Sequence, residues 1–165
     1  MVSGAAPPAR RFLADAMLGR LARWLRVAGF DTATAPDLDD HGLVRLADRE
    51  SRTLLTRDRH LVDHLRPADP LLVRSQRPLE QLREVSDACG LLRPPGLFTR
   101  CLVCNAALEP LPREEADRLL PERARALPGP TCLCPSCGRV YWPGSHTWRM
   151  RDDLARAVPY WFESR

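Results

Sequence analysis

The fold is decided by the stretch Phe12-Leu-Ala-Asp15-Ala-Met-Leu-Gly-Arg-Leu-Ala-Arg-Trp-Leu-Arg-Val-Ala28, in which a short apolar run stands directly before a helical pattern. Apolar residues recur from Met17 to Ala28 at the spacing of one helix face, and Gly29 is suited to end that helix. A strand followed at once by a helix is the repeating unit of a parallel α/β sheet. The opposite, solvent-facing side of the helix is expected to carry three arginines: Arg20, Arg23 and Arg26.

The same alternation of short apolar runs and helical patterns continues to about residue 88. It predicts an α/β fold with a right-handed, mostly parallel sheet. Further strands are expected at Thr32–Ala35, Thr53–Thr56 and Leu71–Val73, and further helices at about Asp40–Glu50, His60–Leu65 and Pro78–Cys89.

A boundary is expected at Arg93-Pro-Pro-Gly96, because the composition changes there and a cysteine pattern begins. A small helix is expected at Arg113–Leu120, within the second part. The predicted organisation is a disordered N-terminus at 1–10, an α/β domain at 11–92, a linker at 93–97, a zinc ribbon at 98–150 and a helix or tail at 151–165.

Two Cys-x-x-Cys pairs predict a structural zinc site. Asn105 and Gly138 follow the second cysteine of each pair, where a tight knuckle favours residues that tolerate a left-handed backbone. A redox dithiol is the alternative, but two matched pairs outside a thioredoxin-like unit disfavour it. Cys89 and Cys132 are expected to be thiols without a metal. The predicted zinc ligands are Cys101, Cys104, Cys134 and Cys137.

The composition excludes several classes of protein. All 25 basic residues are arginine, so P-loop ATPases, Schiff-base enzymes and other sites that need a lysine are disfavoured. A net charge of +4 permits an anionic partner. No apolar run approaches the roughly 20 residues that cross a bilayer, so no membrane association is expected. Met1 to Arg10 lacks the apolar core of a signal peptide, and a reducing, cytoplasmic location is expected.

Three aspartates stand where predicted strands and helices meet: Asp15, Asp40 and Asp58. Ligands bind beyond the carboxyl ends of parallel strands, so these carboxylates are expected to face one crevice. Gathered carboxylates favour a hard cation such as Mg²⁺ or Mn²⁺, which would polarise a phosphodiester and activate water. Each aspartate could instead cap a helix.

Larger stretches of the chain resemble a known family. These are Arg11 to Arg26, Gly29-Phe-Asp-Thr32, Asp39-Asp40, Leu54 to Arg59, Arg100 to Asn105, Cys134 to Trp142 and Gly144-Ser-His146. Over about residues 11–150 the chain is similar to the Mut-seven C-terminal ribonuclease domain family, a branch of the PIN-like nucleases. The resemblance implies a PIN-like three-layer α/β/α domain, followed by a small zinc-ribbon domain.

By the same resemblance, the protein is expected to be a Mg²⁺- or Mn²⁺-dependent ribonuclease that acts on single-stranded RNA. The catalytic metal ligands are expected to be Asp15, Asp40 and Asp58, with Asp37 and Asp39 as alternatives to Asp40. The zinc ribbon is expected to aid binding of RNA or of a protein partner, and the resemblance also allows a homodimer. His146 resembles a family position whose role the sequence does not reveal.

Supporting roles follow from residue type, each beside a simpler alternative. Thr56 could orient a water or only pack, and Arg57 could hold the scissile phosphate or form a surface salt bridge. The stripe formed by Arg20, Arg23 and Arg26 could bind an RNA backbone or be merely solvated. The aromatic residues Tyr141 and Trp142 could stack on bases or form the ribbon's own core.

The sequence leaves two other functions to consider. A catalytically silent RNA-binding or scaffold module would follow if the acidic cluster is too sparse for turnover. The stretch His60-Leu-Val-Asp63-His64 imitates an inverted zinc-protease motif, but it has aspartate in place of glutamate and lacks an evident third ligand. A protease is therefore disfavoured.

Overall fold

The computed structural model describes residues 10–163, so the expected disordered N-terminus lies outside the described residues except for Arg10. A four-stranded parallel sheet with the strand order β2-β1-β3-β4 forms the first part, which confirms the predicted α/β fold. Its elements are β1 (Phe12–Ala14), η1 (Ala16–Leu18), α1 (Gly19–Val27), β2 (Thr32–Thr34), α2 (Asp40–Arg49), β3 (Thr53–Thr56), η2 (Leu61–Leu65), β4 (Pro70–Leu72) and α3 (Pro78–Ala88).

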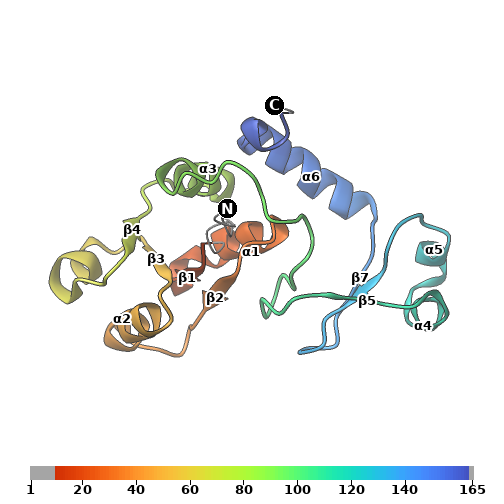
Figure 1. The fold of residues 1–165 in the computed structure, drawn as a ribbon, viewed down its shortest axis with the longest axis horizontal. Helices are drawn as coiled ribbons and strands as arrows, with labels where there is room; N and C mark the ends of the chain where they lie inside the picture. The colour runs from red at the N-terminus through yellow and green to blue at the C-terminus, as the bar shows by residue number, and fades with distance from the viewer. Residues whose placement is uncertain (1–9, 164–165) are drawn as a thin grey trace, which may run out of the picture.

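The sheet is the middle of three layers because β1 and β3 bury side chains on both faces. Phe12 and Ala14 belong to a core with α1 and α3, whereas Leu13 belongs to a second core with α2. Alternate residues of a strand point to opposite faces, so three consecutive apolar residues require cover on each side. The predicted α/β/α layering is therefore present (Figure 1).

The second part is a small antiparallel sheet of three two-residue strands in the order β5-β6-β7. Two short helices cover it with a minor core of Ala116, Leu120 and Ala124. In Figure 1 this part lies to the right of the parallel sheet. Its elements are β5 (Glu109–Pro110), α4 (Arg113–Leu119), α5 (Glu122–Arg125), β6 (Cys132–Leu133) and β7 (Val140–Tyr141).

The last helix departs from the sequence-based prediction. α6 (Ser145–Ala157) begins within the range expected for the ribbon, whereas a helix or tail was expected at 151–165. It runs back toward α3 (Figure 1) and, with η3 (Pro159–Trp161), completes the first core. The reason is an apolar face with helical spacing, formed by Met150, Leu154, Val158 and Trp161. The division into domains at 93–97 stays a prediction.

None of the helices within residues 10–163 has the length and apolar character needed to cross a membrane.

Candidate functional site

Asp15 follows β1 and Asp58 follows β3, the two neighbouring strands in the middle of the sheet. The chain leaves β1 toward β2 and leaves β3 toward β4, so the connections of the sheet diverge between these two strands. α1 leads from β1 to its neighbour β2 on one face, whereas α2 leads from β2 to β3 across the opposite face. The backbone N–H of Asp15 donates to Leu55 O at 3.0 Å, which extends the pairing of β1 with β3. Asp58 follows β3 by two residues. Ligands of such sheets bind in the crevice outside the carboxyl ends of the strands at this point.

Thr56 joins these two aspartates. Its hydroxyl donates to Asp15 Oδ2 at 2.9 Å and accepts from the backbone N–H of Asp58 at 3.0 Å. The side chain is fully buried, so both bonds are shielded from water. Thr56 therefore fixes the direction of the Asp15 carboxylate and the start of the turn that carries Asp58, which is a larger role than packing alone.

Helix capping explains part of the acidic pattern. Asp58 Oδ1 accepts from the N–H of His60 at 2.8 Å and of Leu61 at 3.3 Å, so this carboxylate caps the helical turn that starts at Arg59 and leads into η2. Asp39, and not Asp40, caps α2 by accepting from Gly42 N at 2.7 Å. Asp40 is the first residue of that helix and is exposed. The side chain of Asp15 caps no helix.

The three aspartates share one edge of the sheet but do not form a compact cluster. Within residues 10–163, only the four cysteines form a group of at least three His, Cys, Asp or Glu residues with ligand atoms all within 4.8 Å of one another. Asp15 and Asp58 are half-buried and linked through Thr56, whereas Asp40 is exposed at the start of α2. The geometry thus links two of the three carboxylates and leaves the third separate.

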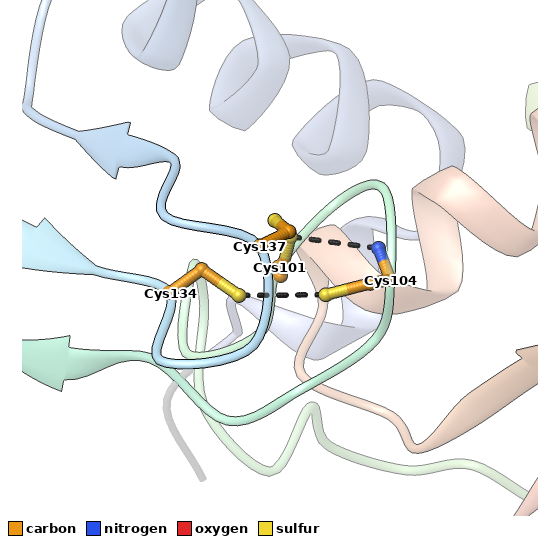
Figure 2. Close-up of side chains that lie close together, drawn as sticks. All are labelled: Cys101, Cys104, Cys134 and Cys137. Atoms are coloured by element: carbon orange, nitrogen blue, oxygen red, sulfur yellow. Dashed lines mark hydrogen bonds between the residues drawn. The ribbon is translucent and has the colours of Figure 1, made fainter.

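The four cysteines form a site suited to zinc. The two knuckles face one another with their sulfurs gathered between them (Figure 2), and Sγ–Sγ separations are 3.6 Å for Cys101–Cys137 and 3.4 Å for Cys104–Cys134. Four thiolates at about 2.3 Å from a tetrahedral zinc would stand about 3.8 Å apart. Asn105 and Gly138 have φ of 70° and 71°, which confirms the left-handed knuckle residues predicted from the sequence. The donor set fits one structural zinc ion.

Tyr141 belongs to this metal centre. Its hydroxyl lies 3.1 Å from Cys101 Sγ and accepts from Leu102 N at 3.1 Å, so it is oriented to donate to the sulfur. Burial raises the pKa of the Cys101 thiol, but hydrogen bonds from the Cys104 N–H and the Tyr141 hydroxyl outweigh it and lower that pKa to about 6. Burial raises the pKa of Cys134 to about 12. A bound cation would favour the thiolate at both positions.

Arg26 links the first knuckle, Cys101–Cys104, to the α/β part by hydrogen bonds. The prediction that its side chain lies on the solvent-facing side of the helix is wrong. The side chain is only 4% exposed. Its Nε donates to Thr32 O at 2.8 Å, and its Nη1 donates to Val103 O at 2.8 Å and Leu102 O at 3.2 Å. Burial lowers the pKa of Arg26, while the nearby Cys101 and Cys104 thiolates oppose that effect. A buried guanidinium is stable here because main-chain oxygens satisfy it.

Asn105 makes a second link between the same parts. Its Nδ2 donates to Asp31 Oδ1 at 2.8 Å, and its Oδ1 accepts from Thr32 N at 2.9 Å. Asp31 also pairs with Arg52 at 2.6 Å. Burial raises the pKa of Asp31, but the bonds from Arg52 and Asn105 outweigh it and hold that pKa below its usual value. The turn that carries Asn105 and the start of β2 thus belong to one polar network.

Substituting Asn105 tests this link, because its backbone and side-chain contributions can be separated. Asn105→Gly keeps the left-handed backbone and is expected to lower the free energy of unfolding by about 1–3 kcal/mol through the lost hydrogen bonds. Asn105→Ala should cost about 1 kcal/mol more, because an alanine is strained at φ 70°. Urea unfolding of the zinc-loaded proteins measures both. If Asn105→Gly has the same free energy of unfolding as the native protein, the Asn105 side chain does not hold the knuckle and the α/β part together.

A family model for the Mut7-C RNAse domain matches residues 10–154, which span both the acidic edge and the four cysteines. The chain belongs to the Mut7-C RNAse domain family. No curated protein matches the chain, and no solved structure does either. Membership in the Mut7-C family indicates a nuclease role, and the RNAse domain implies RNA as the substrate.

The predicted substrate-binding arginines of this Mut7-C domain lie at two places. Arg57 is half-buried between Thr56 and Asp58, and Arg20 and Arg23 are exposed on α1. Within residues 10–163 none of these three forms a salt bridge. The simpler alternative for Arg57, a surface salt bridge, is therefore not what the structure shows.

Two histidines of the Mut7-C chain lie side by side beyond Asp58. The rings of His60 and His64 stack with their centroids 3.9 Å apart, with His60 directly before the π-helical turn η2 and His64 within it. No third His, Cys, Asp or Glu within residues 10–163 completes a metal group with them. The structure therefore offers no zinc-protease site at this position.

Proposed function

We propose that this protein is a Mg²⁺- or Mn²⁺-dependent ribonuclease that hydrolyses phosphodiester bonds of single-stranded RNA at the acidic edge formed by Asp15, Asp40 and Asp58. The observation that carries the proposal is the buried Thr56 hydroxyl, which links Asp15 to Asp58 at the point where the connections of the sheet diverge. In a chain of an RNAse domain family, carboxylates held in place at a ligand-binding crevice are best explained by catalysis.

The donor set fits a hard divalent cation. Mg²⁺ prefers carboxylate oxygens, keeps several of its waters and is commonly held by only one or two carboxylates together with substrate phosphates. Asp15 and Asp58 would supply those two, and Asp40, or Asp37 or Asp39 just before it, would supply a further ligand or a water contact. Such an ion supplies Lewis-acid polarisation of the phosphate and an activated water.

The chain's own residues supply positioning and charge. Thr56 keeps one Asp15 oxygen engaged, so the carboxylate presents a fixed direction to the crevice. The cap that Asp58 makes on the turn leading into η2 fixes its carboxylate in the same way. Arg57 stands between them and would bind a phosphate oxygen of the substrate, since a guanidinium matches phosphate geometry.

The silent RNA-binding module remains the second candidate because of one observation. The three aspartates do not come within 4.8 Å of one another as a group, so turnover would need the third carboxylate to act at longer range or to approach. In that case the protein would bind RNA and cleave none.

A cleavage assay separates the two candidates. Single-stranded RNA carrying a 5′ label is incubated with protein that retains zinc but no other metal, with and without added Mn²⁺ or Mg²⁺. The ribonuclease proposal expects products only when Mn²⁺ or Mg²⁺ is present. An Asp58→Asn preparation made in parallel controls for a contaminating nuclease. Bound but intact RNA under both metals would favour the silent module.

A further inference from the structure

A large groove separates the zinc ribbon from α6. Its volume is about 1060 Å³, at the upper end of the roughly 300–1,000 Å³ typical of ligand sites, so it has room for an extended ligand. One wall comes from β7 and α5, and the other from the first turns of α6. In Figure 1 these walls are the ribbon at the right and the helix that leaves it toward α3.

Two tryptophans line the groove with exposed rings. Trp142 is 37% exposed and Trp148 is 54% exposed. The neighbouring Tyr141 is held by the zinc site through its hydroxyl, whereas nothing comparable engages the rings of the two tryptophans in the described residues. Large exposed aromatic rings beside arginines are the usual platform for unpaired bases, which stack on them regardless of sequence.

The charge of the groove matches a phosphate backbone. Arg23, Arg123 and Arg151 are its charged lining residues within the part of the chain that the structure describes, and no carboxylate lines it. A smaller hollow of about 460 Å³ adjoins it at Arg23 and His146 and adds Arg20 and Arg149. The carboxylate of this hollow, Asp153, is paired with Arg156.

None of these five arginines forms a salt bridge within residues 10–163. Unpaired guanidinium groups along a strip of surface attract a polyanion, and they favour it over a neutral or basic protein partner.

The arginines that line the groove continue along α1. α1 begins close to the carboxyl end of β1, and Arg20 lies in its first turn, five residues after Asp15. Arg23 lies one turn further along the same face, where the smaller hollow meets the larger groove. A strand of RNA that follows these arginines would run from the ribbon to the first turn of α1, which follows Asp15 in the chain.

We propose that single-stranded RNA binds in this groove, with its bases stacked on Trp142 and Trp148 and its phosphates bound by the arginines between the ribbon and α1. The proposal rests on the proposed ribonuclease function and adds the path by which the substrate reaches the edge. It assigns to the ribbon and α6 a substrate-binding surface in addition to the structural zinc site.

The test measures RNA affinity separately from cleavage. Fluorescence anisotropy follows a 5′-fluorescein uridine 20-mer without Mg²⁺ or Mn²⁺, in the zinc-loaded Asp58→Asn protein and in variants of it. Trp142→Ala combined with Trp148→Ala is expected to raise Kd at least ten-fold. Trp142→Phe combined with Trp148→Phe retains aromatic rings and is expected to stay within about three-fold. Zinc content and thermal unfolding establish that each variant is folded.

Arginine variants test the backbone contacts. Arg23→Ala with Arg151→Ala is expected to weaken binding and to reduce the slope of log Kd against log salt by about 0.7 per lost phosphate contact. The matched control, Arg77→Ala with Arg83→Ala, removes two exposed arginines of the α3 region and should leave the slope unchanged.

The outcomes separate the two proposals. If the folded Trp142→Ala/Trp148→Ala protein binds RNA with unchanged affinity, the proposal that RNA binds in the groove is wrong, even if the native protein cleaves RNA. Weakened binding in that variant supports the groove, even if the native protein proves unable to cleave. An equal loss of affinity in the phenylalanine pair would also overturn the stacking model, because ring retention would then have no effect.

Discussion

Asp15→Asn is expected to lower the rate of RNA cleavage by about 10³-fold or more while leaving the fold intact. The amide removes a negative charge from the proposed cation site, and a loss of about 4 kcal/mol of transition-state stabilisation corresponds to that factor. Stability should change little, because the amide oxygen of asparagine can still accept the hydrogen bond from Thr56. Single-turnover cleavage in Mn²⁺ and thermal unfolding of the same preparation measure the two effects.

Glu115→Gln is the matched control for the charge change. Glu115 is exposed on α4, outside the acidic edge. A comparable loss of activity in Glu115→Gln would show that the loss follows from the change of net charge and not from the proposed cation site. Full cleavage by Asp15→Asn would remove Asp15 from the site and leave the proposed chemistry without its best-positioned carboxylate.

Local patterns sufficed to predict the layered part of the fold. Strands at residues 12–14 and 53–56 and the helix starting at Pro78 follow from apolar runs and helix-start residues near in sequence. The start of α6 was missed because the zinc pattern extended the expected ribbon to residue 150. The apolar face of Met150, Leu154 and Val158 was the available signal.

The sequence placed the candidate aspartates at the ends of strands and at helix starts, but it did not predict their geometry. The order of strands and helices places Asp15 and Asp58 at one edge, since parallel strands end together. Which oxygen Thr56 would engage depends on the register of β1 against β3, which no local pattern encodes. Arg26 shows the same limit, because its helical position indicates exposure while its partners lie in a knuckle more than 70 residues away.

Cys134→Ser is expected to abolish zinc binding and to destabilise both parts of the protein. Cys134 is fully buried, and its sulfur lies 3.4 Å from that of Cys104. A serine hydroxyl does not ionise to an equivalent ligand, and structural zinc contributes on the order of 10 kcal/mol to the folding of small zinc domains. Zinc released per chain should fall from one ion to nearly none, as measured with a colorimetric chelator.

The effect should reach the α/β part through Arg26. Without the knuckle, its guanidinium loses the carbonyls of Leu102 and Val103, and a hydrogen bond of a charged group contributes roughly 1.5–3 kcal/mol. Urea unfolding should therefore show a lower midpoint for the whole chain and not only for the ribbon. Cys132→Ser, two residues away and outside the cluster, should keep its zinc and lose little stability. Zinc retained in Cys134→Ser, or lost equally in Cys132→Ser, would contradict the four-cysteine assignment, because only the first substitution removes a proposed ligand.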